Sequence, residues 1–186
     1  VDFELPGYLR AQRQVHAAWQ RFAAAEPTVM ITSDPVVTPI QLGSTEAFQI
    51  ARSSPQLDSD GARRGTLLVP AATQATMHFP DGTPPLELES MNVRITEFTV
   101  GANGPAAMPA PLPPQSHYTY AFELNADEAV AAGAEEVIFS QPLIYYVENF
   151  LDFPAGSTVP VGSYDRTRGV WDTEENGVVM DIVSES

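Results

Sequence analysis

With 186 residues, of which 44% are hydrophobic and 9% aromatic, the chain is long enough for one domain, or two small ones, around a buried core. Its net charge of −15, in which all nine basic residues are arginines, disfavours binding to nucleic acid and to anionic membrane surfaces. The absence of cysteine excludes disulfides, thiolate metal ligands and a thiol nucleophile. No apolar run reaches the roughly 18 residues of a transmembrane helix, so no membrane insertion is expected.

Residues 1–60 are predicted to form an N-terminal β segment with linker strands. The strands are predicted from alternating or β-branched runs bounded by turn residues. They are expected at residues 1–5, 28–31, 36–42 and 48–52. Pro39 lies inside one of these runs and predicts an edge strand or a bulge, because proline cannot donate to a sheet ladder.

Residues 8–22 fit two patterns. Val15, Trp19 and Phe22 recur at helical spacing, which favours an amphipathic helix. The alternation of side chains at residues 8–15 also permits a strand. Both alternatives remain open on these residues alone.

Residues 61–186 are predicted to form the main domain. Strands separated by short turn-rich stretches indicate an all-β fold, mainly an antiparallel β-sandwich. The longest alternating run covers residues 91–100, and prolines and glycines make residues 101–115 a loop. The other expected strands are residues 66–70, 75–79, 118–124, 137–140 and 143–147.

One short helix is predicted at residues 125–133. Asn125 is the expected N-cap, Glu128 completes a capping box three residues later, and Gly133 provides the left-handed C-cap. Near the C-terminus, Asn176-Gly177 predicts a tight two-residue hairpin.

Several motifs in the second half carry a family resemblance. They are NVRITEFTVG at residues 92–101, GPAAMP at 104–109, YTYA at 118–121, and the aromatic run at 146–165. Together they resemble a β-sandwich domain that lies upstream of the YD repeats in bacterial RHS-repeat proteins. Residues 3–13 resemble the final hairpin of a carboxypeptidase-regulatory-like sandwich, and residues 67–70 and 139–142 have a weaker similarity to ZU-type sandwiches.

The resemblance implies a non-enzymatic structural or interaction module of a large secreted or surface-associated bacterial protein. Its partners would be neighbouring domains of the same polypeptide or other proteins. The loop at residues 101–115 would dock on these partners, together with exposed aromatic side chains. The aromatic residues expected to form this interaction surface are Tyr146, Phe150, Phe153, Tyr164 and Trp171.

Two alternative functions depend on specific residues. Asp58 and Asp60 resemble the first half of a calcium loop, but the twelfth position, which should be a glutamate, is Val69. This leaves a calcium- or carbohydrate-binding accessory module as one alternative, with stacking on the aromatic residues. The Phe139-Ser140 bond resembles the cleavage site of self-cleaving sandwiches, although no histidine precedes it locally. No catalytic residue, cofactor or other metal ligand is expected.

Overall fold

The computed structural model of the chain describes residues 1–112 and 119–183. Strand accounts for 38% of it and helix for 7%, which confirms the all-β prediction. Within these residues, no helix has the length and apolarity needed to cross a bilayer. The start of the strand expected at residues 118–124 and the end of the loop expected at 101–115 lie outside the described residues.

The strands are short and every pairing between them is antiparallel. In chain order the elements are β1 (Asp2–Phe3), β2 (Ala11–Gln12), β3 (Thr38–Gln41), β4 (Phe48–Arg52), β5 (Gln56–Asp58), β6 (Gly61–Arg63), β7 (Gly65–Pro70), β8 (Ala75–His78), β9 (Leu86–Leu88), β10 (Ser90–Glu97), η1 (Gly101–Ala107), β11 (Phe122–Ala126), α1 (Asp127–Ala132), β12 (Glu136–Phe139), β13 (Ile144–Val147), β14 (Thr158–Val159), β15 (Gly162–Asp165), β16 (Val170–Thr173) and β17 (Gly177–Val178).

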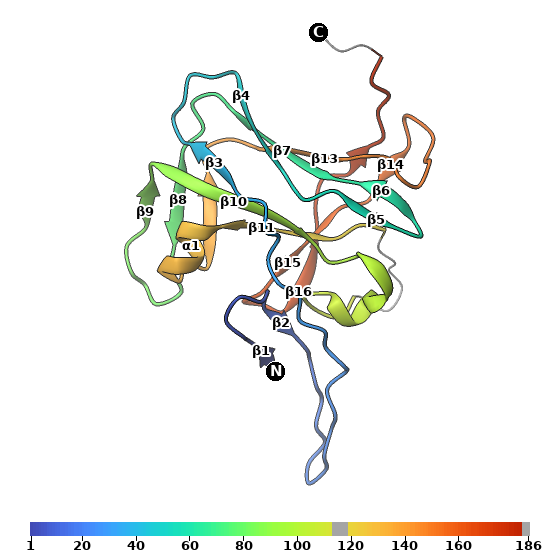
Figure 1. Cartoon of the computed structure of the whole chain (residues 1–186). Coiled ribbons are helices and arrows are strands. Elements are labelled where there is room, and N and C mark those ends of the chain that lie inside the picture. Colours follow the sequence, from blue (N-terminus) through green and yellow to red (C-terminus); the bar gives the residue numbers. More distant parts are fainter. Residues whose placement is uncertain (113–118, 184–186) are drawn as a thin grey trace.

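The main core lies between two three-stranded sheets, in the orders β13-β7-β4 and β11-β10-β3 (Figure 1). Burial alternates along much of β7 and β10, as expected for strands that place one face on a core. The side chains on the inward face are apolar. A third sheet, β12-β8-β9, contributes Ala75 to the same core. The buried residues of this core are Ile40, Leu42, Ala51, Leu67, Val69, Ala75, Met91, Val93 and Ile95.

A second, smaller core joins the N-terminus to the later hairpin of β15 and β16. Leu9, Phe98 and Met108 are buried in it, and Trp171 packs against them. Arg13 is buried beside this core, where its guanidinium donates to the carbonyls of Met108 and Ala106 at 3.1 and 2.9 Å. The arginine therefore ties the N-terminal segment to the end of η1 and the residue just after it, where the Ala106 carbonyl also accepts from the Val29 N–H.

The segment between β2 and β3 leaves the body as a long arm (Figure 1). Residues 8–22 form no helix: β2 is extended, and a turn closes where the Arg21 N–H donates to the Ala18 carbonyl at 3.0 Å. Trp19 and Phe22 lie fully exposed near this turn. The strand expected at residues 28–31 is absent, and only an isolated bridge joins Tyr8 and Thr32.

Residues 38–52 belong to the same sandwich as the later strands. β3 pairs with β10, and β4 pairs with β7. The boundary expected between residues 60 and 61 falls inside the β5–β6 hairpin, where Asp58 pairs with Gly61. The predicted division into residues 1–60 and 61–186 therefore does not match the sheet pairing, because both sheets need strands from each side of it.

Local predictions about caps and turns had mixed outcomes. Gly133 ends α1 with φ 72°, as expected for a left-handed C-cap. Asn125 is wrong as the N-cap, because it lies in β11 and Ala126 occupies the cap without a side-chain bond. Asn176-Gly177 forms no two-residue hairpin, because Gly177 begins β17, which pairs with the distant β14. The loop predicted for residues 101–115 contains the 3₁₀ segment η1, broken at Gly104.

Candidate functional site

The outward face of the β13-β7-β4 sheet is apolar, and we call it the docking face. It consists of Phe48, Ile50, Arg52, Leu68, Ile144 and Tyr146. Ile50, Leu68 and Ile144 form one row across the three strands, because Leu68 pairs with both of the others. Phe48, Ile50 and Ile144 are each about half exposed. A contiguous exposed apolar face of this kind is typical of an interaction surface.

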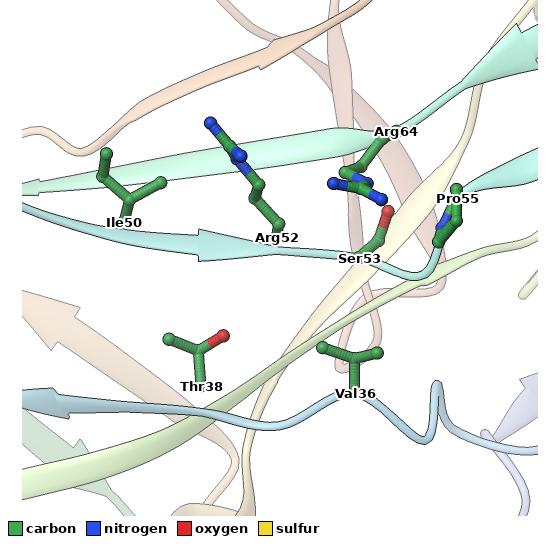
Figure 2. Close-up of a pocket in the computed structure, with 7 residues that line it drawn as sticks. All are labelled: Val36, Thr38, Ile50, Arg52, Ser53, Pro55 and Arg64. Atoms are coloured by element: carbon green, nitrogen blue, oxygen red, sulfur yellow. The ribbon is translucent and has the colours of Figure 1, made fainter.

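An open groove of about 390 Å³ borders the docking face, and we call it the edge groove (Figure 2). It is lined by Val36, Thr38, Ile50, Arg52, Ser53, Pro55 and Arg64. Figure 2 shows Ile50 and Arg52 projecting from β4 on the side away from Val36 and Thr38, which lie on the neighbouring segment that leads into and forms β3. Both β3 and β4 are edge strands of their sheets. The free edge belongs to β4, where the backbone groups of Ile50 and Arg52 face away from β7 without a ladder partner.

Two glutamines close one end of the edge groove. Gln49 on β4 accepts a hydrogen bond from the Gln41 N–H at 2.8 Å and donates its side-chain amide to the Gln41 carbonyl at 2.7 Å. This reciprocal pair joins β3 to β4 through a side chain instead of a backbone ladder. At the other end, the carboxylate of Asp34, before β3, accepts hydrogen bonds from the N–H of Ser54, after β4, at 2.9 Å and from the Ser54 hydroxyl at 2.8 Å, so the two segments are joined at both ends of the groove.

Two arginines, Arg52 and Arg64, line the edge groove of this strongly acidic chain, and the Glu148 carboxylate accepts a hydrogen bond from the backbone N–H of Arg64. Five of the nine arginines pair with carboxylates, namely Arg10, Arg63, Arg94, Arg166 and Arg168. Arg52 and Arg64 form no ion pair with any carboxylate in the described residues. The Nε of Arg64 is also buried without a hydrogen-bond partner there. Because a buried donor without an acceptor is costly, this atom marks a place where an acceptor would stabilise the fold.

A buried ionic cluster lies beneath the edge groove and fixes the direction of Arg64. The side chain of Arg63 is 1% exposed, and its Nε donates to Glu97 Oε1 at 2.6 Å. Its two terminal nitrogens donate to the two oxygens of Asp58 at 2.8 and 2.9 Å. Consecutive residues of an extended segment point to opposite sides, so the next residue, Arg64, faces away from this cluster.

The cluster explains the state of Asp58. The hydrogen bonds from Arg63, followed by backbone N–H groups of Gly101 and Asp60, hold the pKa of Asp58 well below its usual range. The same bonds raise the pKa of Arg63 above its ordinary value. The oxygens of Asp58 are thus occupied by Arg63 and are not free calcium ligands. Asp60 is exposed and accepts a weak contact from Ser59 at 3.4 Å.

Aromatic side chains surround this cluster. The Phe150 ring centroid lies 4.5 Å from the Arg63 guanidinium carbon, a cation–π contact. Tyr120 and Tyr145 share a hydrogen bond of 2.8 Å between their hydroxyls. Burial raises the pKa of Tyr120 to about 12 and raises that of Tyr145 further. Both hydroxyls therefore remain protonated at neutral pH and serve as structural hydrogen-bonding groups.

The structure does not bring the five predicted aromatic residues to one surface. Tyr146 lies on the docking face, and Phe153 is exposed in the loop after β13. Phe150 packs on Arg63 instead. Tyr164 and Trp171 pack together at 5.1 Å, and they hydrogen bond to Gln12 and to the Pro111 carbonyl. These last two residues hold the N-terminus to the β15–β16 hairpin.

The Phe139-Ser140 bond, considered as an alternative self-cleavage site, is an ordinary strand end. The Ser140 hydroxyl accepts a hydrogen bond from the Gln74 N–H at 2.9 Å, and the Ser140 N–H donates to the Gln74 carbonyl. Within residues 1–112 and 119–183, no group of three or more His, Asp or Glu side chains is arranged to bind a metal ion. The strongest candidate site is therefore the docking face with its edge groove.

Sequence reasoning predicted β4 but missed its role. The run from Phe48 to Arg52 was predicted as a strand, and its outward residues are an aromatic, an aliphatic and an arginine. A strand that buries Ala51 and still carries Phe48 and Ile50 on the other face has two apolar faces. That pattern was the available signal for a face that needs a partner.

Comparisons with known proteins do not assign the chain to a family. Neither a family model, nor a curated protein, nor a solved structure matches the chain.

Proposed function

We propose that the chain is a non-enzymatic interaction module of a large secreted or surface-associated bacterial protein of the RHS type. Its sandwich presents the docking face and the edge groove to a neighbouring domain or to another protein. The sequence motifs at residues 92–101 and 146–165 support the RHS context, and the exposed apolar sheet face supports the docking role.

One observation carries the proposal. Phe48, Ile50 and Ile144 on the docking face are each about half exposed. The same strands carry Ala51 and Tyr145 of the main core on their opposite side. A sheet face that stays apolar and exposed on strands that already supply the core is suited to docking on another protein surface.

The proposal is tested by comparing the chain with a longer polypeptide that includes the residues flanking it in its gene. We expect the longer polypeptide to bind less of the dye ANS, after subtraction of the flanking part measured alone, because docking covers apolar surface. We also expect the sandwich to melt at a higher temperature. Ile50→Ser in the isolated chain is a matched control that lowers dye binding without a partner.

Equal dye binding and an unchanged melting temperature in the longer polypeptide would contradict the proposal. Turnover of an ester, peptide or glycoside by the purified chain, abolished by one substitution, would contradict its non-enzymatic part.

A further inference from the structure

Two features lack partners within the described chain and match each other chemically. One is the edge groove. The other is the stretch Met180–Val183, which we call the C-terminal segment. Val179 is the last described residue bonded to the body, through backbone hydrogen bonds of 3.0 Å to Ser157 and 2.8 Å to Gly156. Figure 1 shows the chain beyond it leading away from the sheets.

The C-terminal segment is apolar and exposed. Met180, Ile182 and Val183 are 76%, 79% and 93% exposed. Asp181 is exposed between them and forms no ion pair with any described arginine. In an extended conformation Met180 and Ile182 point to one side, and Asp181 points to the other. The segment thus offers three apolar side chains, of which Val183 lies on the same side as Asp181, together with one carboxylate and a backbone without ladder partners among the described residues.

The edge groove supplies what such a segment needs. The edge of β4 can accept an added strand, because the backbone groups of Phe48, Ile50 and Arg52 face away from β7 and have no ladder partner. Arg52 and Ile50 project from the same side of β4 and so face Asp181 and Val183 of such a strand, while Val36 offers an apolar contact. Neither Arg52 nor Arg64 forms an ion pair in the described residues. Arg64 Nε additionally lacks any acceptor among the described residues. Charge complementarity therefore favours a carboxylate in this groove over a neutral side chain.

We propose that the edge groove binds the C-terminal segment of a second copy of this chain as an added strand, with Asp181 paired to Arg52 and Arg64. This rests on the proposed interaction function of the docking face. The segment leads away from its own sheets, so binding to another copy gives a partner both to the edge groove and to the C-terminal segment. When the exchange is reciprocal, two copies form a closed dimer.

Sedimentation equilibrium of the full chain over a range of concentrations tests the proposal. We expect a dimer that dissociates on dilution, and a monomer at all concentrations when residues 180–186 are deleted. Arg52→Glu should weaken the dimer by at least about tenfold, because it places like charges together. Arg168→Glu is the matched control, since Arg168 pairs with Asp165 in the distant β15–β16 hairpin, and it should leave dimerisation unchanged.

Charge exchange separates a direct contact from a folding defect. Asp181→Arg combined with Arg52→Glu should restore the dimer that each single change weakens. A fluorescent peptide of residues 177–183 should bind the deleted chain and lose affinity on Arg52→Glu. A monomeric full chain, a dimer that survives the deletion, or a peptide that does not bind would each overturn the proposal. These outcomes leave the proposed module function standing, because docking to the flanking sequence is measured separately.

Discussion

Arg63 organises the junction between the sandwich and the loop that follows β10. Its buried guanidinium joins Asp58 on β5 to Glu97 at the end of β10, while Phe150 covers it. Glu97 is only 2% exposed, so its charge depends on this one cation and on the hydroxyl of Thr99. A buried ion pair of this kind costs the fold little free energy while every partner is present. Removing one partner leaves a buried charge unpaired, which destabilises the folded state strongly.

Removing the arginine should therefore destabilise the protein strongly. We expect Arg63→Met to lower the free energy of unfolding by about 3–5 kcal/mol, because Glu97 is left buried and unpaired. Arg63→Met with Glu97→Gln should recover part of this loss. Urea denaturation measures both, and Arg168→Met, which breaks an exposed and solvent-screened pair, should change stability far less than Arg63→Met. A loss of similar size for both arginines would refute the distinction.

The depressed pKa of Asp58 gives a pH dependence with a defined sign. A carboxyl group whose pKa is lowered by folding contributes stability above its unfolded pKa of about 3.9. That contribution is lost as the pH falls below this value toward the folded pKa. We expect Asp58→Asn to flatten the fall in unfolding free energy below about pH 5, as measured by urea titrations at several pH values. Parallel curves for the variant and the native chain would contradict this assignment.

At the scale of single elements, the alternation of side chains predicted most strands but not the absence of one at residues 28–31, and cap chemistry predicted the C-cap Gly133 but not the N-cap. β4 matches its predicted residues, and Pro39 lies in an edge strand as expected, because the requirement for a ladder donor is local to the residue. Asn125 failed as a cap because its strand continues β11 alongside β10. Gly177 pairs with the distant β14 instead of forming a turn, and a local turn pattern carries no information about such long-range pairing.

The true partner of Glu128 gives a test of this correction. Its carboxylate accepts hydrogen bonds from the Asn92 N–H at 2.8 Å and the Asn92 side-chain amide at 2.7 Å. We expect Glu128→Ala to cost about 1–3 kcal/mol, because it leaves part-buried donors on β10 unpaired. Asn125→Ala should cost less than the ~1 kcal/mol of a lost N-cap, because its Oδ1 has no partner in the described residues. Thermal melts of the two variants measure these losses. A larger loss of stability for Asn125→Ala than for Glu128→Ala would support the predicted capping box instead.

For the whole molecule, sequence patterns predicted the class of fold but not the division of the chain. The family resemblances and the polar turn before residue 61 suggested two units, yet β3 and β4 complete sheets built from later strands. Long-range pairing of this kind leaves no local signal. The docking face was likewise not predictable from aromatic residues, because Phe150, Tyr164 and Trp171 are used inside the protein.

A fragment of residues 61–186 should consequently not fold on its own. It lacks Ile40, Leu42 and Ala51 from the main core and leaves β7 and β10 each without one neighbour. We expect no cooperative thermal transition by circular dichroism, whereas the whole chain should show one. A sharp transition in the fragment would support the boundary near residue 60.

Hydrogen exchange at the amides of β4 tests the interaction function most directly. The amides of Phe48, Ile50 and Arg52 face away from β7 at a sheet edge, so they should exchange rapidly in the isolated, dilute chain. In the longer polypeptide that includes the flanking sequence, docking at the edge groove should slow exchange at these amides and leave the central strand β7 unchanged. Identical exchange of β4 in the two polypeptides would contradict a docking role for this face.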